Sequence, residues 1–459
     1  MNAKAKEELE IVKNGVRKYV PKLGEFIDLE TPLLEYSQKV YQVEVEDKYL
    51  ERQEGLKKNI QEQSLLLFGD KAQDFEFKLN GPLIANIVDH NGILNHPVLL
   101  SSHIVSSAAQ LYNPSFDILS LNTAFYPFNS VFYDGGLTWK QERHRFISNS
   151  KSQQLVYYGQ PIDFSRFPEE ARLKLDQADS PTSSTAWQQA GRVNYHLWPQ
   201  LFEKKLRSNL PSLITLNQDE IVIKLITSLI QQGNNFIHDI IFNSDLRAQC
   251  RKVFEGSTGA WDEVNNKGSF LFWGVDEQKR GIGLKLSNNK LISTVEKYPY
   301  QLSLTPEHVI NALNTREIYP GMVLIFGAFV FYSGLVPLAG YGSVNYLNVM
   351  QELWLRLLPG KYAEECDSIN RMVINKLIGG PVLTYYRDNN GELRQAYMLD
   401  VLMSSGLTKK YLDKIFTMSF GDLLLAPLID IYNTYIPEKH RQPISITPAD
   451  VVSEQLSWI

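Results

Sequence analysis

The fold is decided by residues 82–122, which read PLIANIVDHNGILNHPVLLSSHIVSSAAQLYNPSFDILSLN. The apolar run 82–88 predicts a buried strand that ends in the turn-forming residues 89–92. Apolar residues then recur at helical spacing from Asn95 to about residue 111, with Pro97 in the first turn of the expected helix. The next apolar run, 116–121, predicts a second strand. A strand, a helix and a strand at this spacing predict a βαβ unit with a parallel strand pair.

The remainder of the chain surrounds this unit with helices and further strands. Residues 4–18 and 31–65 combine apolar residues at helical spacing with many charged ones, so we expect a helical N-terminal region. Strand patterns occur in residues 153–158, 269–275, 281–286, 381–386 and 393–399, the last two forming a hairpin. We therefore expect an α/β or α+β fold in which helices frame a mixed sheet.

The length of 459 residues exceeds the size at which one hydrophobic core usually stops growing. Either one large domain or two domains would fit this length. Composition divides the chain into a helical region 1–70, an α/β segment 71–175, a polar linker or loop 176–186, and a region of mixed helix and sheet, 187–459. The last region is either a second unit or part of the same domain.

The composition argues against several classes of protein. The formal net charge of −5 and the absence of a long basic cluster give no reason to expect a nucleic-acid partner. Two cysteines, Cys250 and Cys366, form no metal-binding spacing and suggest reduced thiols. The charged N-terminus lacks the apolar stretch of a signal peptide. We expect a soluble, cytoplasmic protein.

Residues 322–338 are the most apolar segment, and no charge occurs between residues 318 and 351. This segment is near the lower length limit for a membrane span, and Gly327, Gly334 and Pro337 interrupt it. We therefore expect it to be a buried strand or helix of the core, and we expect no membrane partner.

The candidate catalytic residues are Asp89, His90 and His96, which follow the first predicted strand. Ligands of open α/β sheets bind at the carboxyl ends of the strands, where Asn122 and Thr123 of the second strand should also lie. A histidine there can transfer protons, and Asp89 can orient its imidazole. We expect Asn95, Asn122 and Thr123 to contact the substrate.

Two other interpretations of this segment remain open. Asp-His-Asn-Gly is also good turn chemistry, and Asn95-His96-Pro97 is a good helix start. His90, His96 and His103 are compatible with a divalent metal but match no standard metal motif, so the cofactor stays unassigned. His103 alone is more typical of a histidine satisfied within the fold.

Two further segments are candidates for anion binding. Arg143 and Arg145 flank His144 and could hold a carboxylate or phosphate, although a solvated charged face has the same pattern. Residues 340–346, GYGSVNY, could let a ligand approach the backbone before a helix, or could serve tight packing. No P-loop or complete dinucleotide fingerprint occurs in the sequence.

These features favour an enzyme of small-molecule metabolism that uses His/Asp acid–base chemistry on a polar, anionic substrate. Hydrolase, lyase and transferase reactions are not distinguished by the sequence, and neither is the oligomeric state. The alternative is a non-catalytic ligand-binding protein, scaffold or effector. An enzyme should bring the candidate residues together in one pocket, whereas a scaffold should scatter them over exposed turns.

Overall fold

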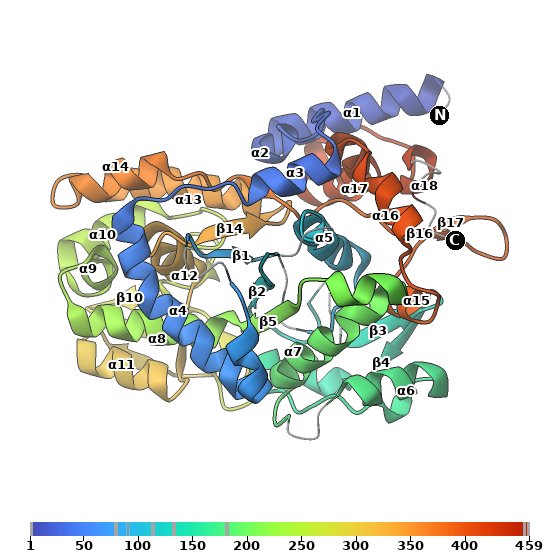
Figure 1. Ribbon diagram of the computed structural model, residues 1–459. Coiled ribbons are helices and arrows are strands. Elements are labelled where there is room, and N and C mark those ends of the chain that lie inside the picture. The colour runs from blue at the N-terminus through green and yellow to red at the C-terminus, as the bar shows by residue number, and fades with distance from the viewer. Residues whose placement is uncertain are drawn as a thin grey trace.

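The computed structural model describes residues 3–77, 81–88, 90, 92–111, 115–130, 135–179, 183–452 and 456. Helices surround a parallel five-stranded sheet (Figure 1). Its strands, in order across the sheet, are β15 (Lys376–Leu377), β14 (Val336–Ala339), β1 (Ile84–Asn86), β2 (Ile118–Asn122) and β5 (Leu213–Asn217). The predicted α/β class is confirmed.

The predicted βαβ unit is present. β1 and β2 pair in parallel with Asn86 opposite Ser120, and α5 (Pro97–Ser107) connects them. The helix begins one residue later than expected, because the His96 side chain, not that of Asn95, accepts the hydrogen bond of the Val98 N–H at 3.3 Å. His103 has the structural role anticipated for it, since its Nδ1 contacts the Asn86 amide at 3.0 Å in the core.

Residues 322–338 are buried in the core, as predicted. They form α12 (Met322–Phe326), a π-helical stretch (Gly327–Tyr332) and strand β14. Leu324, Phe329 and Phe331 have no measurable exposure to solvent. No helix within the described ranges is both long enough and apolar enough to cross a membrane.

The helical N-terminal region is also confirmed. It consists of α1 (Ala3–Tyr19), α2 (Pro21–Gly24), α3 (Leu33–Val40) and α4 (Asp47–Phe68). Two buried glutamines of α4 hydrogen-bond with backbone groups at the sheet: Gln53 with Leu83 N and Gly334 O, and Gln63 with the N–H and carbonyl of Asn217. Near the chain ends, α1 packs on α17 (Phe420–Tyr435) (Figure 1).

A β-rich insertion lies between α10 (Ser244–Val253) and α11 (Pro306–Asn314). Its main strands are β8 (Phe272–Val275), β9 (Gly281–Ile282), β10 (Leu284–Ser287), β11 (Lys290–Ser293) and β12 (Gln301–Ser303). β8 and β9 are antiparallel, and β8 also pairs with β13 (Ile318–Pro320). The hairpin predicted from residues 381–386 and 393–399 is formed by β16 (Tyr385–Arg387) and β17 (Leu393–Gln395).

The expected strand at residues 153–158 is wrong. Residues Val156–Tyr158 form a short 3₁₀ helix instead. The N–H groups of Val156 and Tyr157 donate to the carbonyls of Tyr126 and Ala124, in the loop after β2, rather than to a neighbouring strand. Because the Tyr158 N–H also bonds back to Leu155, the segment closes as a turn.

The remaining helices pack around the sheet. α7 (Ala186–Leu197) packs on β5, and α8 (Gln218–Gln232) packs on α4 and β2. The predicted linker 176–186 overlaps the end of α6 (Glu169–Ala178), and the domain boundaries remain a prediction. The other helices are α9 (Phe236–Phe242), α13 (Ser343–Leu357), α14 (Ala363–Arg371), α15 (Met398–Leu402), α16 (Lys409–Phe416) and α18 (Pro448–Val451).

Candidate functional site

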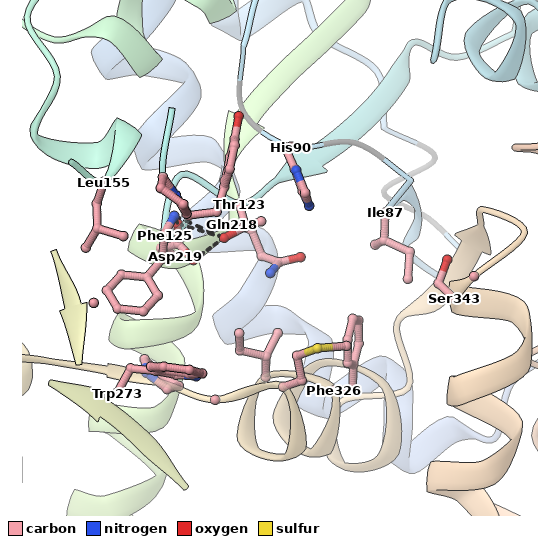
Figure 2. Close-up of a pocket in the computed structure, with 18 of the residues that line it drawn as sticks. Ile87, His90, Thr123, Phe125, Leu155, Gln218, Asp219, Trp273, Phe326 and Ser343 are labelled. Carbon is pink, nitrogen blue, oxygen red and sulfur yellow. Dashed lines mark hydrogen bonds between the residues drawn. The ribbon is translucent and has the colours of Figure 1, made fainter. Parts of the chain in front are cut away.

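A cavity of about 850 Å³ opens at the carboxyl ends of the central strands. Each of four strands contributes the residues that immediately follow it, and the β-rich insertion and α12 supply the opposite walls (Figure 2). The residues at the strand ends are Ile87, Val88 and His90 after β1, Thr123, Phe125 and Tyr126 after β2, Gln218 and Asp219 after β5, and Gly340, Tyr341, Gly342 and Ser343 after β14. This volume is typical of a pocket for an organic ligand.

The cavity lies at the point where the strand order reverses. If the five strands are numbered along the chain, their order across the sheet is 3-2-1-4-5, and β1 therefore separates β2 from β14. The crossovers on the two sides of β1 run in opposite directions, which leaves a crevice between the loops that follow β1 and β14. Both of these loops line the cavity.

His90 projects into the cavity from the loop after β1 (Figure 2). A bridge between His90 and Thr123 extends the pairing of β1 and β2 beyond the strands. The His90 ring packs against Tyr126 at a tilt of 34°, with a centroid distance of 4.1 Å, and its Nδ1 contacts Ser130 Oγ at 3.2 Å. Burial lowers the pKa of His90 to about 4, so the imidazole is neutral at physiological pH.

Asp219 organises the loop after β2. Its carboxylate accepts hydrogen bonds from Thr123 Oγ1 at 2.9 Å and from the N–H groups of Ala124 and Phe125 at 2.6 and 2.9 Å. Burial raises the pKa of Asp219 to about 6, although these hydrogen bonds act in the opposite direction. The group is therefore mainly ionised at neutral pH, with its oxygens engaged by the loop.

Aromatic rings line the cavity on the loop after β2, on the insertion and on α12. Phe125 stacks on Tyr319 with ring centroids 4.2 Å apart, and Trp273 and Phe326 also line the cavity. At the insertion, Arg280 Nε donates to Asp276 Oδ2 at 2.7 Å, and the guanidinium lies over the ring of Tyr298. Among the described lining residues, Arg280 is the one cationic side chain, and it is already paired.

Of the three candidate catalytic residues, His90 is the one placed at the cavity. Asp89 lies outside the described residues. His96 caps α5 and contacts Tyr397 edge-on at 6.0 Å between ring centroids, away from the cavity lining. Burial, together with the nearby charge of Arg143, lowers the pKa of His96 to about 4.

The candidate substrate-binding residues are dispersed. Thr123 lines the cavity, whereas the carbonyl of Asn95 accepts from Met398 N at 3.0 Å, next to α15. Asn122 is fully buried, and its Oδ1 accepts from Ser120 Oγ. The strands β3 (Gly136–Trp139) and β4 (Glu142–Arg145) form a hairpin that packs toward α15, which places Arg143 near His96 and not at the cavity.

Arg145 lines a different, smaller hollow, where its Nη1 donates to Asn149 Oδ1 at 2.9 Å. The residues Gly340–Ser343 do reach the cavity, at the N-terminus of α13. Two N–H groups in the first turn of this helix, those of Val344 and Asn345, donate to the carbonyls of Gly340 and Gly342. These two groups are therefore not free to bind an anion.

Sequence reasoning missed Gln218 and Asp219. Both follow β5, whose apolar run 213–216 is short and precedes the Asn-Gln-Asp start of α8. Asn217 Oδ1 accepts from Asp219 N at 2.8 Å, so this asparagine caps the helix and fixes the two residues after it. A buried strand followed at once by a capped helix is the signal that could have identified them.

Metal binding receives no support from geometry. Within the part of the chain that the structure describes, no three side chains of His, Cys, Asp or Glu cluster as a metal site would require. His90, His96 and His103 lie in three separate environments, beside Ser130, at the N-terminus of α5 and beside Asn86, respectively.

The same three histidines predict that the protein loses stability in mild acid. Burial lowers their pKa values from 6.5 to about 4, 4 and 3. Because the unfolded chain takes up these protons near pH 6.5 and the folded chain does not, this stabilisation is complete above pH 6.5 and is lost as the pH falls toward 4. At about 1.4 kcal/mol per pKa unit, the free energy of unfolding should fall by a few kcal/mol.

Urea unfolding at pH 7 and pH 5 measures this loss. Replacing the exposed His308 with glutamine should leave the difference between the two pH values unchanged. Equal stability of the wild-type protein at both pH values would show that the buried histidines do not control its acid sensitivity.

No family model matches the chain, and no curated protein has significant sequence similarity to it.

Proposed function

We propose that the protein is an enzyme of small-molecule metabolism that binds a nucleotide-type ligand in the cavity at the ends of β1, β2, β5 and β14. The observation that carries this proposal is the position of the cavity at the reversal of a 3-2-1-4-5 strand order. Sheets with this order commonly bind nucleotides at that point. The support is an analogy at the level of the fold, to which the chemistry of the lining is added.

The walls of the cavity suit a planar ring better than a densely charged molecule. Phe125, Trp273 and Phe326 offer surfaces for stacking, while Arg280 is the one described cation that could meet a phosphate. The N-terminus of α5, where many nucleotide-binding sheets hold a pyrophosphate, is capped by His96 in this protein. The ligand should therefore carry few negative charges, whereas Arg143 and Arg145 led to the expectation of a polar, anionic substrate.

His90 is the residue best suited to proton transfer. It is neutral, its Nδ1 is held beside Ser130, and no described residue hydrogen-bonds with its Nε2. The imidazole can therefore accept a proton from the ligand. Hydrolysis, elimination and group transfer are all compatible with this role, and a cytoplasmic location remains part of the proposal.

Ligand-induced stabilisation tests the proposal. Adenosine monophosphate and guanosine monophosphate should raise the melting temperature, whereas ribose 5-phosphate, which lacks the base, should not. A ligand present at 100 times its dissociation constant stabilises the folded state by about 2.7 kcal/mol. Val88 is half-buried and lines the cavity, so the larger side chain of Val88→Trp should narrow the cavity beside the ends of β1 and β14 and reduce the shift.

A shift of equal size with ribose 5-phosphate, or no shift with either nucleotide, would contradict a nucleotide site. A nucleotide that binds but is never consumed would favour the non-catalytic alternative.

A further inference from the structure

The side chain of Gln218 is placed in the cavity by the start of α8. Gln218 is the first residue of the helix, directly after the capping residue Asn217, which holds the backbone at this point. Figure 2 shows the carboxamide directed into the cavity, opposite Phe326. The residue is only 6% exposed, and its amide has no hydrogen-bond partner among the described residues.

The Gln218 amide faces an open cavity, so water can hydrogen-bond with it until a ligand with matching groups takes the place of that water. The neighbouring Asp219 carboxylate accepts hydrogen bonds from Thr123, Ala124 and Phe125, and none joins it to the side chain of Gln218 within the described structure. The amide of Gln218 is therefore free to pair with a ligand through one donor and one acceptor.

The following inference rests on the proposed nucleotide site. We infer that Gln218 determines ligand specificity by hydrogen-bonding with the edge of an uncharged ring of the ligand, where a donor and an acceptor lie side by side. Glutamine recognises the amino group and ring nitrogen of adenine in this way. The charges of the residues around Gln218 are consistent with a ligand ring whose edge carries no charge. Asp219 is adjacent and anionic, the His90 imidazole is neutral, and Arg280 is paired with Asp276. The aromatic residues Phe125 and Trp273 line the same cavity, where they can stack on the faces of such a ring.

Calorimetric titration with adenosine and with purine riboside, which lacks only the exocyclic amino group, tests this role. The wild-type protein should bind adenosine about tenfold more tightly or better, since purine riboside leaves the Gln218 oxygen unpaired. Gln218→Met has a side chain of similar length without hydrogen-bonding groups, and should bind both nucleosides equally. Gln153 also lines the cavity but is exposed, so Gln153→Met should keep the preference.

Melting temperatures verify that each variant is folded. If Gln218→Met does not fold, Gln218→Leu provides the second test, because it removes both the carbonyl acceptor and the N–H donor and should lose the preference. Equal binding of both nucleosides to the wild type, or a preference that survives in the Gln218 variants, overturns the role of Gln218 while leaving the nucleotide site standing. Failure of the wild type to bind either nucleoside or adenosine monophosphate overturns the proposed function itself.

Discussion

Replacing His90 with glutamine is expected to reduce turnover by about 100- to 10,000-fold once a substrate of the cavity is known, which is the usual effect of removing a general acid or base. The ring is half-buried at the cavity, packed against Tyr126 and held by Ser130, so the substitution removes a positioned proton acceptor. Because the pKa of His90 is already lowered to about 4, kcat/KM should not titrate with His90 between pH 6 and 8.

His96→Gln is the matched control for this prediction. His96 caps α5 and does not line the cavity, so its loss should lower the free energy of unfolding by about 1 kcal/mol and change turnover little. Paired melting and activity assays separate the two effects. Near-normal turnover in His90→Gln would place the chemistry elsewhere, and Arg143, Arg145 and the loop 340–346 would be examined next.

Replacing Asp219 with alanine is expected to lower the free energy of unfolding by about 3–5 kcal/mol, because each buried donor left unpaired costs about 1–3 kcal/mol. The substitution leaves Thr123 Oγ1 and the N–H groups of Ala124 and Phe125 without their acceptor. The loop after β2 carries Phe125 into the cavity, so ligand affinity should fall as well.

Asp219→Asn separates the effect of losing the hydrogen bonds on stability from the effect of losing the charge. Asparagine keeps one acceptor oxygen for the two N–H groups and can donate to Thr123, so its stability should lie between that of the wild type and that of Asp219→Ala. Urea unfolding of the three proteins gives this order directly. A loss below about 1 kcal/mol in Asp219→Ala would mean that water or a shifted loop satisfies the donors.

The site was only partly accessible to sequence reasoning. The expectation that ligands bind at the carboxyl ends of the strands led to His90 and Thr123. It succeeded there because β1 and β2 are neighbours both along the chain and in the sheet. It also selected His96 and Asn95, which lie near His90 in sequence, yet the chain turns away after Gly92 and the Asn194 side chain of α7 holds this segment. Arg143 was assigned by residue type alone, and the direction of its hairpin is fixed by packing against α15.

What the sequence determined by itself was local: the strand–helix–strand unit, the burial of residues 322–338, the helical N-terminal region and the hairpin predicted from residues 381–386 and 393–399. These features depend on periodicity and turn chemistry within a few residues, or on crossover rules for adjacent elements. Only the tertiary structure decided that β14 pairs with β1, which creates the reversal of strand order. The same long-range packing placed the insertion opposite the strand ends and directed Gln218 into the cavity between them. No local pattern specifies which distant strand will be a neighbour, because that choice depends on how all the apolar faces of the chain are buried together.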